Sequence, residues 1–148
     1  MLKHFTLEEM VDKKTFETEG ENAWDHFDLV ALQALDDLHD FFTTLTGEKS
    51  SILVNTWKWG GPFQFRGYRP PTYKPGVTPG SYHRMGRAFD FDVKDHTATE
   101  ARKLIIGSAK VNNPLTMKVQ RMEDNVTWLH CDTGKVPEGQ PRPYLFRA

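Results

Sequence analysis

The chain is short of the features that mark secreted, disulfide-stabilised and membrane-spanning proteins. Its 148 residues include one cysteine, Cys131, which excludes an internal disulfide bond. The longest uncharged apolar stretch, at residues 52–57, is far too short to cross a bilayer. No basic and apolar signal peptide opens the chain, because Glu8 and Glu9 follow almost at once. We therefore expect cytoplasmic synthesis without a signal peptide, and no membrane partner.

The net charge is also small, at −1, but the charges are unevenly distributed. Residues 1–49 hold 12 acidic and 4 basic side chains, whereas residues 50–148 hold 8 acidic and 15 basic ones. The basic segment suits an anionic substrate, such as a peptide carboxylate or a cell-wall polymer. No nucleic-acid-binding module is recognisable, so we expect no nucleic-acid partner. The length and the 38% content of hydrophobic residues predict a single domain over residues 1–148.

The pattern of apolar residues predicts an α+β fold, with a small antiparallel sheet and flanking helices. Helices are expected at residues 5–11, at residues 25–46, and at residues 97–110, where Thr97 and Glu100 match a capping box. Strands are expected at residues 51–57 and 88–93, and a hairpin at residues 116–122 and 126–133. Residues 60–80 hold five prolines and five glycines, which predicts a long irregular loop, and residues 137–143 predict an extended tail.

Three side chains on these elements predict a metal site. The alternation of residues 88–93 and 127–133 lets two neighbouring strands present Asp90 and His130 to the same point. His83 precedes Gly86, where a turn can fold it back over Asp90. Two imidazoles and one carboxylate are the ligands of a hydrolytic zinc site, which keeps a fourth position open for water. We therefore predict Zn²⁺ at these three residues. Cys131 lies on the opposite strand face and is expected to be a buried hydrophobe.

The same residues carry a resemblance to a known family. The pattern Ser-x-His-x-x-Gly-x-Ala-x-Asp at residues 81–90, followed by an aromatic-x-His at residues 128–130, resembles the zinc D-Ala-D-Ala carboxypeptidase and dipeptidase superfamily. That superfamily includes many phage endolysins and the zinc-binding hedgehog fold. The resemblance spans residues 52–133. It implies a hedgehog/DD-peptidase-like fold, with zinc bound by His83, Asp90 and His130.

The resemblance also implies an activity. The chain is expected to be a zinc metallopeptidase that hydrolyses peptidoglycan stem peptides at D-Ala-D-Ala or L-Ala-D-Glu bonds. It would be a D,D-carboxypeptidase or an endolysin-like endopeptidase. Gly67-Tyr68-Arg69 resembles the Ser-Gly-Tyr-Arg segment of the family, with Arg66 in place of the serine. The arginine that matches Arg69 stabilises negative charge on the substrate.

One departure concerns the general base. Dipeptidases and many endolysins of the superfamily carry Glu or Asp three residues before the last zinc-binding histidine, where this chain has Thr127. Asp132 is the first candidate to replace it, because it shares a strand face with His130. Glu123 and Asp124 are the next candidates. Asp124 lies six residues before His130, a spacing that resembles the base of the hedgehog fold, and Glu123 adjoins it, although both lie where a hairpin turn is expected. Asp132 has a second interpretation, as the group that orients a zinc ligand.

The expected partner is a peptidoglycan peptide, and we expect a monomer. The family suggests release to the cell wall as a phage lysin, carriage in a virion, or a role in bacterial recycling. Because Thr127 cannot act as a base, an alternative from another class stays open. It is a zinc-stabilised binding protein or virion structural protein with the same fold and no hydrolytic activity.

Overall fold

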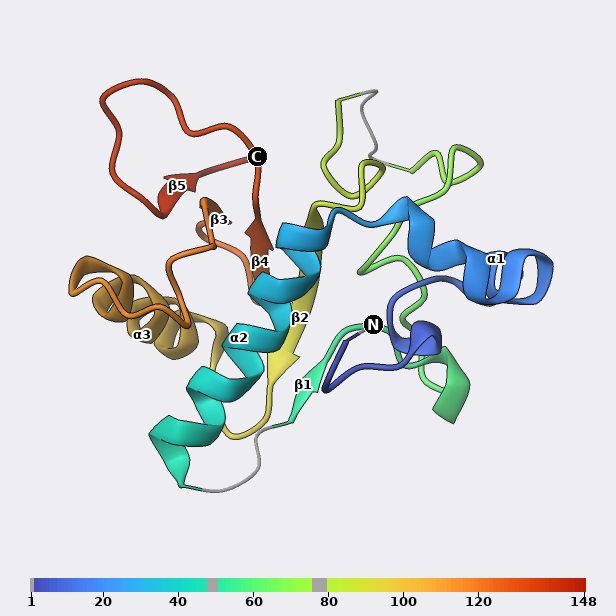
Figure 1. Ribbon diagram of the computed structural model, residues 1–148, viewed down its shortest axis with the longest axis horizontal. Coiled ribbons are helices and arrows are strands. Elements are labelled where there is room, and N and C mark those ends of the chain that lie inside the picture. Colours follow the sequence, from blue (N-terminus) through green and yellow to red (C-terminus); the bar gives the residue numbers. More distant parts are fainter. Residues whose placement is uncertain (1, 48–50, 76–79) are drawn as a thin grey trace.

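The computed structural model describes residues 2–47, 51–75 and 80–148, and it shows a mixed α+β fold around a five-stranded open sheet. The strand order is β1-β2-β4-β3-β5 (Figure 1). The strands are short: β1 Ile52–Leu53, β2 Ala88–Val93, β3 Arg121–Glu123, β4 Leu129–Asp132 and β5 Tyr144–Phe146. The β1–β2, β2–β4 and β3–β4 pairs are antiparallel, but β3 and β5 pair in parallel. The expectation of a purely antiparallel sheet is therefore corrected.

The described residues form three α-helices, α1 at Lys13–Glu19, α2 at Leu29–Thr46 and α3 at Ala98–Lys110, and α1 lies away from the sheet (Figure 1). The helix expected at residues 25–46 begins later, because the Asp28 side chain accepts from the Ala31 amide and so caps α2. Gly47 ends α2 in the left-handed conformation that glycine adopts readily. The capping box of Thr97 and Glu100 is confirmed at the start of α3.

Several sequence expectations placed elements wrongly. The strand expected at residues 51–57 is paired only at β1, and a 3₁₀ helix follows at Trp57–Trp59. The chain turns there because the Thr56 amide and hydroxyl both bond to the backbone of Phe63. The first strand of the hairpin starts at Arg121, after turns at residues 114–118. Helix α1 and strand β5 were not expected, and residues 76–79 of the predicted loop lie outside the described residues.

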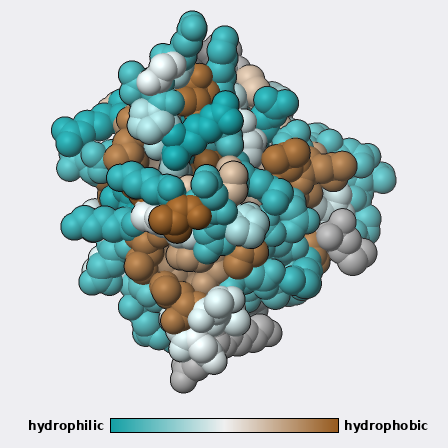
Figure 2. Space-filling model, turned by 60° about the vertical axis from the view of Figure 1, so that its left-hand side comes forward, coloured by the Kyte–Doolittle hydropathy of each residue, from teal (hydrophilic) through white to brown (hydrophobic). Residues whose placement is uncertain are grey.

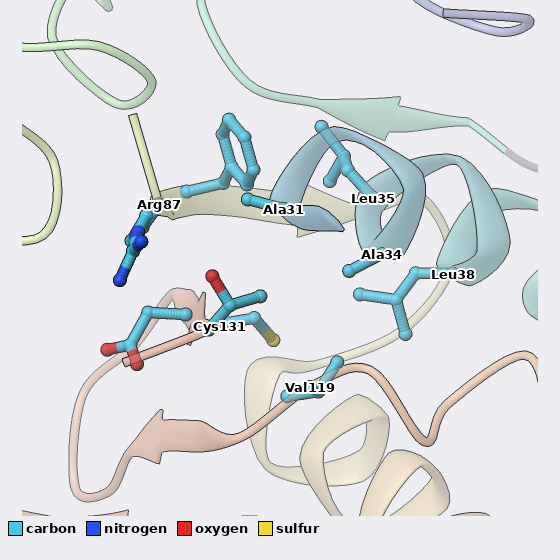
Figure 3. Close-up of a pocket in the computed structure, with 10 residues that line it drawn as sticks. Ala31, Ala34, Leu35, Leu38, Arg87, Val119 and Cys131 are labelled. Carbon is cyan, nitrogen blue, oxygen red and sulfur yellow. The ribbon is translucent and has the colours of Figure 1, made fainter. Parts of the chain in front are cut away.

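Helix α2 covers one face of the sheet (Figure 1). Figure 3 shows its small and branched side chains, including Ala31 and Leu38, around Cys131 of β4 and Val119. These groups leave a cavity of only about 10 Å³, which is about the size of one water molecule. Cys131 is buried in this core, as predicted. Because neighbouring strand residues point to opposite faces, His130 faces away from α2.

The surface in Figure 2 is mostly hydrophilic, with hydrophobic side chains in separate patches. No helix in the described part of the chain combines the length and the apolar composition that a bilayer crossing needs.

Candidate metal centre

The centre of the site is fixed by the pairing of β2 with β4. Asp90 and His130 are directly opposite each other in the register, so their side chains leave the sheet on the same face. The His130 Nδ1 lies 2.8 Å from the Asp90 Oδ1. The sequence prediction that two neighbouring strands bring these residues together is confirmed.

His83 reaches the same point from the turn before β2. Gly86 closes the turn with a φ of +66°, and its amide donates to the His83 carbonyl. The His83 Nδ1 donates to the Gly67 carbonyl over 2.9 Å, which directs the Nε2 toward the Asp90 Oδ2, 3.4 Å away. The loop segment at Gly67 and the turn at Gly86 thus orient the imidazole together.

The three side chains fit a divalent metal ion. His83, Asp90 and His130 are all buried, and one ligand atom of each lies within 4.8 Å of the others. A carbonyl holds the Nδ1 of His83 and a carboxylate holds the Nε2 of His130, which leaves one nitrogen of each ring turned toward Asp90. Metal-binding histidines are commonly fixed in this way through the second ring nitrogen. The donor set, two imidazoles and one carboxylate, is one that zinc accepts.

The ionisable side chains of the site shift one another's pKa values. Burial alone would raise the pKa of Asp90, but hydrogen bonds from His130 and His83 outweigh burial and hold that pKa below its usual range. Burial alone would lower the pKa of His130, but its bonds to Asp132 and Asp90 raise that pKa to about 9. Such an arrangement concentrates negative charge on carboxylates that face the ring nitrogens.

Asp132 is held by donors on both oxygens. Its Oδ2 lies 2.8 Å from the Nε2 of His130, and the Arg121 guanidinium forks onto both oxygens at 2.9 and 3.0 Å. The Gly134 amide donates to its Oδ1. Burial opposes ionisation of Asp132, but these bonds from His130 and Arg121 lower its pKa overall. Because the Asp132 side chain has no exposed surface, it is better suited to orienting the ring of His130 than to exchanging a proton with a substrate.

Arg121 was missed by the sequence reasoning. It lies opposite Asp132 in the β3–β4 register, and its guanidinium sits between the rings of Tyr82 and Phe146, 4.7 and 4.3 Å from their centroids. Only the register could have revealed it, and the register depends on where β3 begins.

Arg69 is brought to the site, as the sequence suggested. Its Nη2 donates to the Asp90 Oδ2 over 3.1 Å, and its Nε donates to the Phe65 carbonyl over 2.8 Å. Its backbone amide donates to the His83 carbonyl. The guanidinium is therefore anchored beside the carboxylate of the candidate metal site.

The three candidate metal ligands, together with Arg69 and Arg121, line an open cleft with a volume of about 470 Å³. Glu123, at the end of β3, lines this cleft together with Arg69, His83 and Trp128. Its neighbour Asp124 does not, and instead lies 4.0 Å from Arg102 and 3.6 Å from Arg147. The two carboxylates that the sequence could not separate thus have different surroundings, because adjacent residues at a strand end point in opposite directions.

A second group of possible ligands is formed by His4, His39 and Asp40. The His4 Nε2 and the Lys3 ammonium each lie 2.7 Å from an oxygen of Asp40. Burial distinguishes the two groups, because His4 and Asp40 are only half-buried whereas His83, Asp90 and His130 are all buried.

Comparisons of the chain with protein-family models, with curated proteins and with solved structures find no match.

The turn that carries His83 yields a first prediction. A Cβ at Gly86 would collide with the backbone of His26 and Phe27, in addition to the strain of the positive φ. We expect Gly86→Ala to lower the free energy of unfolding by more than about 1 kcal/mol and to weaken zinc binding. Gly107→Ala is the matched control, because a Cβ there meets nothing within 4 Å. Denaturant unfolding and zinc titration of both variants measure the effect, and equal results for the two would contradict it.

A second prediction separates the two roles of Asp132. If Asp132 orients His130, Asp132→Asn weakens zinc binding by about 10- to 100-fold. Arg121→Lys should show a smaller loss of the same kind, because lysine keeps the charge but not the planar fork. Competition with a chromophoric chelator gives both affinities. If Asp132 is instead the general base, the zinc affinity of Asp132→Asn stays unchanged while turnover is lost at saturating zinc.

Proposed function

We propose that the protein is a zinc metallopeptidase. The observation that carries this proposal is the buried group of His83, Asp90 and His130 at the wall of an open cleft that also holds a guanidinium and a further carboxylate. A purely structural metal site has closed coordination, usually by four protein ligands. Three ligands beside an open cleft match a hydrolytic site better.

The metal would be held by one nitrogen each of His83 and His130 and by the Asp90 carboxylate. When bound, Zn²⁺ polarises a carbonyl group and acidifies a water molecule. The chain's own residues do the rest. Arg69 is anchored beside Asp90 and positioned to bind negative charge on the substrate, either the developing oxyanion or a carboxylate.

Glu123 is the best-placed proton acceptor among the three candidates. It lines the cleft, whereas Asp132 is saturated by donors and Asp124 is paired with arginines outside the cleft. We assign to Glu123 the removal of a proton from the attacking water and its delivery to the leaving amine. Asp132 holds the ring of His130, and Arg121 holds Asp132.

The substrate class follows from the resemblance of residues 81–90 and 128–130 to the D-Ala-D-Ala carboxypeptidase and dipeptidase superfamily. We propose a peptide bond of a peptidoglycan stem peptide, with a D-amino acid on at least one side. A D,D-carboxypeptidase and an endolysin-like endopeptidase are the two candidate activities.

One observation favours a second candidate, a zinc-stabilised binding protein without hydrolytic activity. Thr127 occupies the position at which dipeptidases and many endolysins of the superfamily that the sequence resembles carry the general base. Thr127 lines a hollow whose only carboxylates, among its lining residues, are those of Asp90 and Asp92. Asp90 is a proposed ligand. This candidate keeps the metal site and the cleft but transfers no proton.

The test is incubation of the zinc-loaded protein with purified peptidoglycan, followed by mass analysis of the released fragments. A peptidase yields fragments with one new amine terminus at a single type of bond, and the His130→Ala protein yields none. Binding to peptidoglycan without any new terminus would support the non-catalytic candidate.

A further inference from the structure

A second hollow of about 350 Å³ adjoins the cleft. The two share Asp90 and Trp128, so the hollow begins at the candidate metal site itself. We call it the Asp92 hollow, and its lining residues are Phe63, Arg66, Asp90, Asp92, Thr127 and Trp128. Asp92 lies two residues beyond Asp90 on the same face of β2, at a distance of roughly 7 Å along a strand. A substrate bound at Asp90 therefore extends into the hollow within about two residues.

The two paired charges in this hollow, those of Arg66 and Asp92, differ in their exposure to solvent. The Arg66 Nη1 lies 3.0 Å from the Asp92 Oδ2. The exposed fraction of the side chain is 49% for Asp92 but only 10% for Arg66. Arg66 also bonds to the Leu53 carbonyl and lies over the ring of Phe63, with 4.3 Å to its centroid. The Arg66 guanidinium is thus largely buried and bonded to the protein through its Nη1, whereas the half-exposed carboxylate of Asp92 is the charge that a ligand meets first.

The walls of the hollow favour the same kind of ligand. Trp128 is 37% exposed and lies on its border, and Phe63 is also partly exposed. An aromatic face beside an accessible carboxylate attracts an ammonium group through both the ring and the charge. An anionic group would instead meet Asp92 and the Asp90 carboxylate.

We propose that the Asp92 hollow is a subsite for a substrate residue that carries an ammonium group, such as the side chain of a diamino acid within two residues of the cleaved bond. The inference rests on the proposed peptidase function and adds the charge of the residue that the enzyme selects. Asp92 acts as the specificity-determining residue, and Arg66 is a positioning residue that fixes its carboxylate.

The test compares two peptides that differ by one charge, Nα-acetyl-Lys-D-Ala-D-Ala and Nα,Nε-diacetyl-Lys-D-Ala-D-Ala. We expect the zinc-loaded protein to bind the first about five- to tenfold more tightly, by calorimetry or NMR titration. The same ratio should appear in kcat/KM where the peptide is cleaved. Asp92→Asn should bring the ratio close to one, while Asp95→Asn, an exposed carboxylate on the following turn, should leave it unchanged.

The outcomes separate the two proposals. Absence of cleavage of both peptides and of peptidoglycan would overturn the peptidase function, and the binding ratio would still decide the subsite. Equal binding of the two peptides, tighter binding of the diacetylated one, or no binding of either would overturn the ammonium subsite. The comparison on the wild-type protein does not depend on the folding of any variant.

Discussion

His83→Ala and His130→Ala are expected to purify with little zinc, and their affinity should fall by at least about 100-fold. Each replacement leaves two of three protein ligands, and losing a ligand costs more affinity than the roughly 10- to 100-fold lost with a residue that only hydrogen-bonds to a ligand. Elemental analysis and chelator competition measure zinc per chain and affinity. His96→Ala is the control, because His96 follows β2 and lies outside both groups of possible ligands. Full zinc occupancy of His83→Ala or His130→Ala at micromolar free metal would refute the assignment.

The same variants should lose the stabilisation that zinc gives to the wild type. Metal that binds only the native state stabilises it by about 2.7 kcal/mol at a free concentration 100 times the dissociation constant. A chelator should therefore lower the Tm of the wild type and of His96→Ala, but leave the Tm of His130→Ala nearly unchanged.

Glu123→Gln is expected to lower turnover on peptidoglycan by about 10²- to 10⁴-fold while zinc content stays at the wild-type level. Glutamine keeps the size and hydrogen-bonding capacity of the side chain but cannot accept a proton in the useful pH range. Asp124→Asn is the matched control and should be close to neutral, because Asp124 is paired with arginines away from the cleft. Turnover is followed by release of new amine termini.

Two other outcomes of this experiment would assign the general base to another carboxylate. Full activity of Glu123→Gln together with loss of activity in Asp124→Asn would identify Asp124 as the general base. Full activity of both, with loss in Asp132→Asn at saturating zinc, would return the role to Asp132 despite its saturated oxygens.

The metal centre was predictable because it depends on patterns that a sequence displays. Alternation along residues 88–93 and 127–133 assigns Asp90 and His130 to faces, and a glycine three residues after His83 marks the turn. The structure confirms this placement through the register of β2 and β4. The helix caps at Gly47 and Thr97 were predictable for the same reason, since each depends on residues close in the chain.

The surroundings of the centre were not predictable, because they depend on contacts between distant segments. The Gly67 carbonyl accepts from His83, and the next residue, Tyr68, donates its amide to the Met10 carbonyl. A Cβ at Gly67 would collide with the backbone of Met10. The fork of Arg121 on Asp132 depends on a strand that begins later than hydrophobicity suggests. The sequence of strand β5, Tyr144–Phe146, does not alternate between apolar and polar residues. These residues form a strand because they pair in parallel with β3.

The claim on which the rest depends is that one zinc ion binds at His83, Asp90 and His130. A crystal structure of the zinc-loaded protein with an anomalous difference map at the zinc edge tests it most directly. We expect one strong peak per chain, within bonding distance of the Nε2 of His83, the Nδ1 of His130 and the Asp90 carboxylate. A protein without a peak there, or with its zinc at His4, His39 and Asp40 instead, would contradict the account.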